Sequence, residues 1–317
     1  MKLRQISQGN PVTNIVLDEF EKEAPILQDA EFYSKTGSTD LSKRGREPEQ
    51  PAVNPFRNLN EPETSDPPTR VYDPVVKRIV SFEAQVDKVL EDRNEDVAAE
   101  LEQETRIEAN EVAQTLQGTF FLGDEATNAK SPNGMAALVK PSMVTNGNGG
   151  APLALVLGGD AKRLEQQVVL EFIMNWFRSV RATHAYFPDT FLTRLMLVAK
   201  NLGFYQLQVA KDSMGATVEN DTVGGVILRS TGRTYSGAAI SPFNETLGAA
   251  NDTASAFACR WGTGTDLTVL TSVGVHAEYE GLRGKFYVNT VDMDMQMHLQ
   301  KTRSLGRLRG LRLPAAP

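Results

Sequence analysis

The sequence predicts an α+β fold, and three observations lead to that prediction. Apolar residues recur at helical spacing in several segments before about residue 203, whereas apolar and polar residues alternate near the C-terminus. A proline-rich stretch, residues 31–74, lies between the first helical segment and the others, and no helix can continue through it. The chain therefore combines helices, an extended arm and a strand-rich C-terminal third.

Composition excludes several classes of protein. The 317 residues are 40% apolar and 23% charged, which is ordinary for a globular chain, and the formal net charge is −7. Tight binding of nucleic acid usually needs a basic excess, so sequence-specific DNA or RNA binding is disfavoured. No run approaches about 18 apolar residues, so we expect no membrane partner. The first residues lack the apolar core of a signal peptide.

The first predicted helix covers residues 13–24. Ile15, Val16 and Phe20 lie at helical spacing among acidic residues, and Thr13 or Asn14 is placed to start the helix. Pro25 marks its end.

The proline-rich stretch has two interpretations. A disordered linker is the simpler one, because prolines and glycines interrupt every element. Large apolar residues are spaced along it, however, and they favour an extended arm or long hairpin that packs on another molecule. These residues are Phe32, Tyr33, Val53, Phe56, Leu59, Val71 and Tyr72. Residues 75–91 then alternate in part and read as a strand returning from the hairpin.

The clearest helix follows, from a cap at Asn94 to a stop at Gly118. Its length of about 35 Å, at 1.5 Å per residue, exceeds that of an average helix. One face is apolar, and the other carries seven acidic residues, an arrangement that ordinarily faces solvent. The acidic residues are Glu95, Asp96, Glu100, Glu102, Glu104, Glu108 and Glu111.

Two more helices and several strands complete the chain. Asp160 is placed to cap a helix whose main stripe is Leu164, Val168, Phe172, Trp176 and Val180, and Ile173 and Phe177 widen this stripe, so we expect the helix to be buried over more than one side. A second helix runs from Pro188 to Gly203. We expect strands at residues 204–210, 225–228, 255–261, 267–277 and 291–299, with strict alternation in the last.

No catalytic, cofactor or metal site is evident. The chain has no phosphate-binding loop and no nucleophile elbow, and residues 262–266 read as a hairpin turn. A catalytic pair of Cys259 and His276 is arithmetically possible, but a lone cysteine is usually a small buried apolar residue. Asp292 and Asp294 share one face of a strand with His298 and suit a cation, yet the polar side of an amphipathic strand explains them more simply. We therefore expect no enzyme activity and no cofactor.

The order of parts resembles the tailed-phage major capsid protein family, which has the Hong Kong 97-like fold. Phe120-Phe121-Leu122-Gly123-Asp124, followed by Asn133-Gly134-Met135, is similar to that family's "F-x-x-G-D … f-x-G-L" stretch. The C-terminal part of the sequence also resembles that of several capsid proteins, with Gly281-Leu282 and then Leu308-Arg309-Gly310 among arginines. The resemblance covers residues 12–313.

The resemblance implies five segments. They are an N-arm (1–30), an extended E-loop hairpin (31–92), a peripheral domain with a long spine helix (93–160), an axial domain (161–270), and return strands of the peripheral domain with a C-terminal tail (271–317). It further implies hexamers and pentamers forming an icosahedral shell around double-stranded DNA contacted non-specifically. The implied partners are a separate scaffolding protein, a portal protein and in some cases a decoration protein.

We expect the arm to fasten subunits together in the virion capsid, after assembly in the host cytoplasm. The expected contacts combine apolar residues of the arm with its arginines and with acids of the spine helix: Phe32, Tyr33, Arg44, Arg46, Phe56, Leu59, Tyr72, Glu100 and Glu104. The C-terminal arginines would face phosphate or an interface. Two rivals stay open: an encapsulin-type shell, which shares the fold, and an enzyme of unknown class resting on Asp292 and Asp294.

Overall fold

A computed structural model describes residues 1–7, 9–34, 39–45, 59, 70–93, 95–158, 162–211, 217–263 and 265–313. For residues 39–45, 70–74, 211 and 218 it describes the backbone alone. Its helices are α1 (Leu3–Ile6), α2 (Pro11–Glu23), α3 (Pro25–Asp29), α4 (Val89–Asp92), α5 (Val97–Leu122), α6 (Met135–Leu138), α7 (Arg163–Val180) and α8 (Asp189–Leu202), with 3-10 turns at Pro141–Met143 and Thr302–Ser304.

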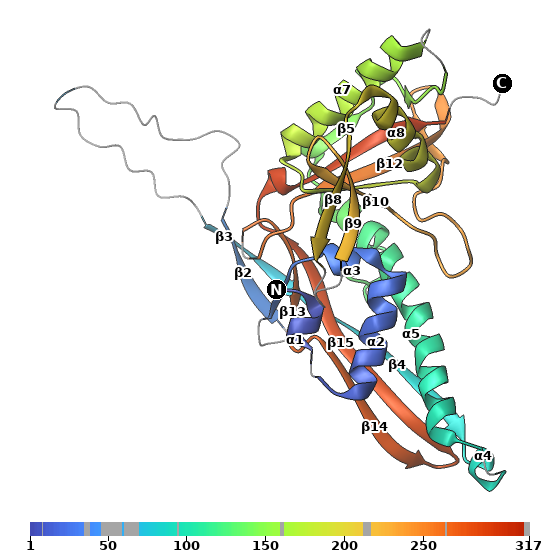
Figure 1. The fold of residues 1–317 in the computed structure, drawn as a ribbon. Coiled ribbons are helices and arrows are strands. Elements are labelled where there is room, and N and C mark those ends of the chain that lie inside the picture. The colour runs from blue at the N-terminus through green and yellow to red at the C-terminus, as the bar shows by residue number, and fades with distance from the viewer. Residues whose placement is uncertain are drawn as a thin grey trace.

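A five-stranded sheet forms one half of the molecule, the lower half in Figure 1. Its strands are β1 (Phe32–Ser34), β4 (Arg78–Asp87), β13 (Leu267–Thr271), β14 (Val275–Arg283) and β15 (Phe286–Leu299). The order is β1-β13-β15-β14, and β4 pairs with the other edge of β15 along ten residues. Helices α2 and α5 lie side by side over this sheet (Figure 1).

A nine-stranded sheet forms the other half, with α7 and α8 packed on it (Figure 1). Its order is β5-β16-β12-β7-β10-β9-β8, with β11 beside β12 and β6 beside β16. The strands are β5 (Val144–Asn146), β6 (Leu153–Ala154), β7 (His184–Phe187), β8 (Tyr205–Lys211), β9 (Thr217–Val223), β10 (Val226–Ser230), β11 (Glu245–Leu247), β12 (Ala250–Cys259) and β16 (Leu305–Arg312).

The expected hairpin is present as a separate two-stranded sheet of β2 (Thr39–Gly45) and β3 (Arg70–Val76). It leaves the body at one side, on the left in Figure 1. The returning strand that the sequence predicts is β4, which joins the five-stranded sheet.

The long helix is longer than its sequence predicts. Asp96 caps it by accepting hydrogen bonds from the amides of Ala98 and Ala99, and its 26 residues span about 39 Å. The predicted stop at Gly118 is wrong, because the helix continues to Leu122 and buries Phe120 and Phe121 in the core. It ends at Gly123, where a Cβ would lie 2.4 Å from the carbonyl oxygen of Pro132.

The predicted apolar stripe of α7 is also wrong in part. Leu164 and Val168 are 72% and 50% exposed, whereas the predicted residues Ile173, Trp176, Phe177 and Val180 are buried. Residues spaced strictly four apart drift by about 40° per step around a helix with 3.6 residues per turn. A stripe that mixes three- and four-residue steps stays on the core, whereas the predicted main stripe begins at the surface and reaches the core only at Trp176 and Val180.

Two expectations for the C-terminal strands need correction. Residues 262–266 connect β12 of the nine-stranded sheet to β13 of the five-stranded sheet, so they do not close a hairpin. Residues 305–312, expected in a tail, form β16 inside the nine-stranded sheet. Val291, Met293 and Met295 are buried as the alternation predicts, but Gln296 and His298 are buried as well.

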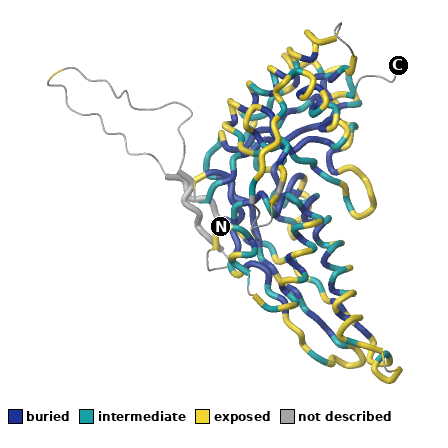
Figure 2. Tube along the Cα trace, viewed as in Figure 1, coloured by how far each residue is buried: buried dark blue, intermediate teal, exposed yellow. Residues whose placement is uncertain are grey.

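Among the described residues, two large hydrophobic cores and one small cluster of Ala84, Val86 and Leu101 hold the halves, and burial runs continuously between the two large cores (Figure 2). The larger core contains α2, the end of α5 and the five-stranded sheet, yet it also includes Tyr186 and Phe257 of the nine-stranded sheet. Phe121 of α5 packs on the nine-stranded sheet from within this core. Its ring centroid lies 5.2 Å from that of Tyr186 and 5.7 Å from that of Phe257. The end of α5 therefore ties the two sheets together.

Candidate subunit-interface surfaces

The base of the hairpin is fixed to the body. Its strands pair antiparallel from Thr39↔Val76 to Gly45↔Arg70, and Val75 and Lys77 are buried at its foot. The Lys77 ammonium donates a hydrogen bond of 2.8 Å to Ser272 Oγ. Arg78, one residue on, forms an ion pair with Glu125. These contacts set the direction in which the arm leaves the body.

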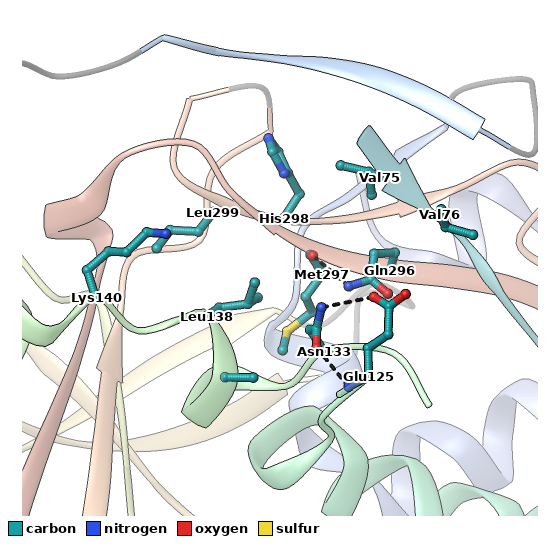
Figure 3. Close-up of a pocket in the computed structure, with 11 residues that line it drawn as sticks. Val75, Val76, Glu125, Asn133, Leu138, Lys140, Gln296, Met297, His298 and Leu299 are labelled. Atoms are coloured by element: carbon teal, nitrogen blue, oxygen red, sulfur yellow. Dashed lines mark hydrogen bonds between the residues drawn. The ribbon is translucent and has the colours of Figure 1, made fainter. Parts of the chain in front are cut away.

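A small pocket lies under this base (Figure 3). Val75, Val76 and Met297 line it together with Asn133 and Glu125, which hold each other by two hydrogen bonds of 2.9 and 3.3 Å. Its volume of about 160 Å³ is below that of ordinary ligand clefts. We interpret the pocket as part of the support for the hairpin.

The predicted contact residues fall into three groups. Phe32 is fully buried in the core of its own chain, where β1 pairs in parallel with β13, so its prediction as an inter-subunit anchor is wrong. Tyr33, the next residue on the strand, points the other way and is 40% exposed. Leu59 is 93% exposed.

Two of the arm's other predicted contacts lie on the paired strands of the hairpin. Arg44 and Tyr72 lie on β2 and β3, where their backbones pair with Val71 and Lys43 respectively. Arg46 and Phe56 lie outside the described residues. Asn94, the predicted helix cap, lies outside them too, and Asp96 has that role instead.

The acidic face of α5 is exposed at Glu100 and half-buried at Glu104. Between them, Glu102 accepts a hydrogen bond of 2.8 Å from Arg106, which also reaches Glu19 of α2 at 3.3 Å. Neither Glu100 nor Glu104 has an ion pair with another described residue. These two carboxylates are therefore available to cations from outside the subunit.

Sequence reasoning missed a buried polar network where the N-terminal segment meets the nine-stranded sheet. Asp29, only 6% exposed, accepts a hydrogen bond of 3.0 Å from the Tyr186 hydroxyl, which in turn accepts one of 3.1 Å from Trp261 Nε1. The guanidinium of Arg229 lies 3.5 Å from the Asp29 carboxylate, and His184 Nε2 lies 3.6 Å from it. This network fixes how the N-terminal segment sits on the sheet.

Burial dominates the titration of the network. It raises the pKa of Tyr186 far above its ordinary value, so the hydroxyl keeps its proton and donates to Asp29. It also lowers the pKa of His184, although the nearby Asp29 carboxylate acts in the opposite direction. No residue spacing in the sequence signals this cluster, because its members come from α3, β7, β10 and the segment after β12.

The residues considered for chemistry have structural roles. Asp294 accepts hydrogen bonds from the amide of Ser272 and the hydroxyl of Thr271, at 2.6 and 3.1 Å. Burial opposes its ionisation, but these bonds outweigh burial and lower its pKa. Asp292, by contrast, is exposed. The described residues contain no group of three or more histidine, cysteine or acidic side chains placed to hold a metal ion.

Cys259 behaves as a small apolar residue. It is fully buried, and burial raises the pKa of its thiol well above the ordinary value. It lies on β12 of the nine-stranded sheet, whereas His276 lies on β14 of the other sheet, so the two do not form a catalytic pair.

Most of the C-terminal arginines are already paired within the chain. Arg307 and Arg309 contact Glu245 at 3.0 and 3.5 Å, and Arg312 contacts Asp252 at 2.8 Å. Arg303 is exposed. Of these four arginines, Arg303 alone therefore keeps the predicted role of facing phosphate or an interface.

No protein-family model matches the chain, and no curated protein matches it in sequence. No helix among the described residues is both long enough and apolar enough to cross a membrane.

Solved structures, in contrast, match nearly the whole chain. The holo-SrpI encapsulin complex from Synechococcus elongatus PCC 7942 aligns with a TM-score of 0.58 at 10% identity, over 97% of this chain and 91% of that one. A virus-like particle from Pyrococcus furiosus aligns at 0.51 and 8%, over 94% and 97%. The capsid of a native GTA particle aligns at 0.53 and 11%, over 91% and 90%. All three are shell proteins, and the chain has their fold, the Hong Kong 97-like capsid fold.

Proposed function

We propose that this chain is the major capsid protein of a tailed double-stranded DNA phage. In this proposal it assembles into hexamers and pentamers that form an icosahedral shell. The shared fold supports a shell-forming protein, and the phage assignment rests on the motif resemblance around residues 120–135 and 308–310.

The observation that carries the proposal is the hairpin of β2 and β3. It forms a sheet of its own, separate from both larger sheets, and 24 residues lie between its paired ends at Gly45 and Arg70. An isolated two-stranded hairpin is marginal in water, so we infer that a neighbouring subunit covers it. Repetition of that contact by symmetry would hold a shell together.

The proposed contacts omit Phe32 but keep the other predicted residues. Tyr33, Leu59, Phe56 and Tyr72 would contribute apolar contacts, and Arg44 and Arg46 would meet Glu100 and Glu104 of a neighbour. The five-segment division into N-arm, E-loop, peripheral domain, axial domain and return strands is part of the same proposal. In it, the peripheral domain comprises α5 with β14 and β15 of the five-stranded sheet, and the axial domain comprises α7, α8 and strands β7 to β12 of the nine-stranded sheet.

The proposed partners are a separate scaffolding protein, a portal protein and in some shells a decoration protein. Packaged DNA would be contacted without base readout, because the net charge of −7 gives no general grip on phosphate. Assembly would take place in the host cytoplasm and end in the virion capsid.

The second candidate is an encapsulin-type compartment shell. The match to the SrpI encapsulin, at a TM-score of 0.58, is the specific observation that favours it. The two candidates differ in what the particle holds, since a phage capsid is filled with DNA and a compartment shell with protein.

Size-exclusion chromatography and negative-stain electron microscopy of the purified chain test the proposal. We expect hollow shells, hexamers or pentamers, and a stable monomer or dimer would rule the shell function out. Nuclease-protected DNA in particles from the native source would support the phage capsid, whereas enclosed protein without DNA would support the compartment.

A further inference from the structure

Three Asn-Gly dipeptides occur in the sequence: Asn133-Gly134, Asn146-Gly147 and Asn148-Gly149. In such a pair, the side-chain amide of the asparagine can react with the backbone nitrogen of the glycine, because glycine has no Cβ to block the approach. The reaction needs a glycine nitrogen that is free to lose its proton, and an asparagine side chain that is free to turn. The fold treats the three dipeptides differently in both respects.

The first dipeptide is held at both reacting groups. The Asn133 side chain accepts a hydrogen bond of 2.9 Å from the backbone amide of Glu125 and donates one of 3.3 Å to the Glu125 carboxylate. The amide of Gly134 donates to the carbonyl oxygen of Gly123 at 2.7 Å. A Cβ on Gly134 would lie 2.5 Å from the carbonyl oxygen of Thr119, so the backbone there has no room to turn.

The second dipeptide is held through its backbone. Gly147 is buried, and its amide donates a hydrogen bond of 2.9 Å to the carbonyl oxygen of Arg309 on β16. A Cβ on Gly147 would lie 1.9 Å from the carbonyl oxygen of Ala151, so the glycine is closely packed. Ring closure at Asn146 must therefore break a hydrogen bond and displace packed backbone before it can occur.

The third dipeptide is open. Asn148 and Gly149 are exposed, and neither the Asn148 side chain nor the Gly149 amide has a hydrogen-bond partner among the described residues. A Cβ on Gly149 would meet no atom within 4 Å. Gly149 and Gly150, with φ of +63° and +89°, form the tip of a two-residue turn that two hydrogen bonds between Asn148 and Ala151 close, at 3.0 and 3.2 Å. The nitrogen of Gly149 is therefore free to react.

We propose that Asn148 is a site of spontaneous deamidation, and that the fold confines the reaction to this one of the three dipeptides. Solvent hydroxide removes the proton from the Gly149 nitrogen, which attacks Cγ of Asn148. The new N–Cγ bond forms, the Cγ–Nδ2 bond breaks, and ammonia leaves with a proton from water, so that a cyclic succinimide remains. Water then opens the ring. Cleavage of the N–Cγ bond gives aspartate, and cleavage of the bond from the Asn148 carbonyl carbon to the Gly149 nitrogen gives isoaspartate.

The modification acts on one edge of the nine-stranded sheet. The turn connects β5 to β6, and both of these strands pair in parallel with β16. Either product adds a negative charge at position 148, and isoaspartate also adds one carbon atom to the backbone of the turn. Because a two-residue turn fixes the register of the segments that it joins, the longer backbone should weaken the pairing of β6 with β16. The reaction needs only water and the folded subunit, so it does not depend on the proposed function.

Peptide mapping of the purified full-length chain tests the proposal. Trypsin does not cut between Lys140 and Pro141, so all three dipeptides fall in one tryptic peptide, residues 131–162. The folded chain is incubated at mildly alkaline pH in heavy-oxygen water, which labels each reacted asparagine, and tandem mass spectrometry measures the label at each position. We expect Asn148 to react at least about fivefold faster than Asn146, a ratio that corresponds to about 1 kcal/mol, the net contribution of one hydrogen bond. Asn133 should be the slowest.

Two controls separate the effect of the fold from that of the sequence. In concentrated urea the hydrogen bonds of the fold are lost, so the three asparagines should react within about threefold of one another. Asn148→Gln, which does not form the same ring, should abolish the label at that position and leave the rate at Asn146 unchanged. Equal rates at Asn146 and Asn148 in the folded chain, no reaction at Asn148, or the folded-state differences persisting in urea would overturn the proposal.

Discussion

Tyr186→Phe tests whether the buried network joins the N-terminal segment to the nine-stranded sheet. The change removes one oxygen atom from a fully buried ring. It deletes the hydrogen bond of 3.0 Å to Asp29 and leaves Trp261 Nε1 without its acceptor at 3.1 Å. The Asp29 carboxylate then keeps only the longer contacts, 3.5 Å to Arg229 and 3.6 Å to His184.

Each of the two buried groups that lose this partner is destabilising by about 1–3 kcal/mol, so we expect a loss of roughly 2–6 kcal/mol in the free energy of unfolding. The assay is urea unfolding of unassembled subunits, followed by circular dichroism, with the slope checked for two-state behaviour. Tyr205→Phe is the matched control, because Tyr205 also donates to a carboxylate, Asp221 at 2.5 Å, but is only half-buried. A loss below about 1 kcal/mol for Tyr186→Phe, or one equal to the control, would refute the role of the network.

Three further changes probe other parts of the molecule. Burial lowers the pKa of His184 below its ordinary 6.5, so the unfolded chain binds the histidine proton more readily than the folded one. The free energy of unfolding should therefore fall as the pH drops below about 6.5. His184→Gln should flatten that part of a plot of stability against pH, and an unchanged plot would contradict the assignment. At Gly310, φ is +86° and a Cβ would lie 2.2 Å from Leu247 Cδ2, so Gly310→Ala should lower the thermal midpoint by several degrees, with partial recovery on adding Leu247→Ala. Deleting residues 38–68 should abolish particles in electron micrographs while circular dichroism shows a folded body; particles that survive the deletion would disprove the role of the arm.

Sequence patterns were sufficient for the elements whose periodicity is strong. The helix of α8, from Asp189 to its left-handed cap at Gly203, follows from Pro188, the apolar spacing and the glycine. The strand β15 follows from alternation at residues 291–295. These elements bury one face against a single neighbouring layer, and so the spacing of apolar residues along the sequence predicts them.

The sequence failed where tertiary contacts override local signals. Gly118 does not end α5, because burial of Phe120 and Phe121 outweighs the low helix propensity of one glycine, about 1 kcal/mol. Phe32 reads as an arm residue, but pairing of β1 with β13 carries it into the core. The Asp29 network could not be found, because no periodicity relates residues that meet from four separate parts of the chain.

Ion pairs within the chain determine which charged side chains are left for contacts between subunits. Arginines on the body are largely committed to carboxylates of the same chain: Arg4 to Asp18, Arg106 to Glu102, Arg260 to Asp266, Arg283 to Glu83, and Arg307 to Glu245. Glu95, just before α5, and Glu100 and Glu104 in its first half nevertheless have no ion pair to any described residue. Like charges gathered on one helix repel one another, and a cation from outside removes that repulsion.

One source of such cations in the sequence is the arm, which carries Lys43, Arg44, Arg46 and Arg57. If it does so, contacts between subunits should weaken with salt, because exposed ion pairs are screened within about 10 Å at 0.1 M. The fold of each subunit, held by its two apolar cores, should change far less. We therefore expect moderate salt to separate particles into folded subunits, as measured by light scattering and circular dichroism on one sample. Light scattering that does not change with salt would show that the contacts between subunits are not electrostatic in origin.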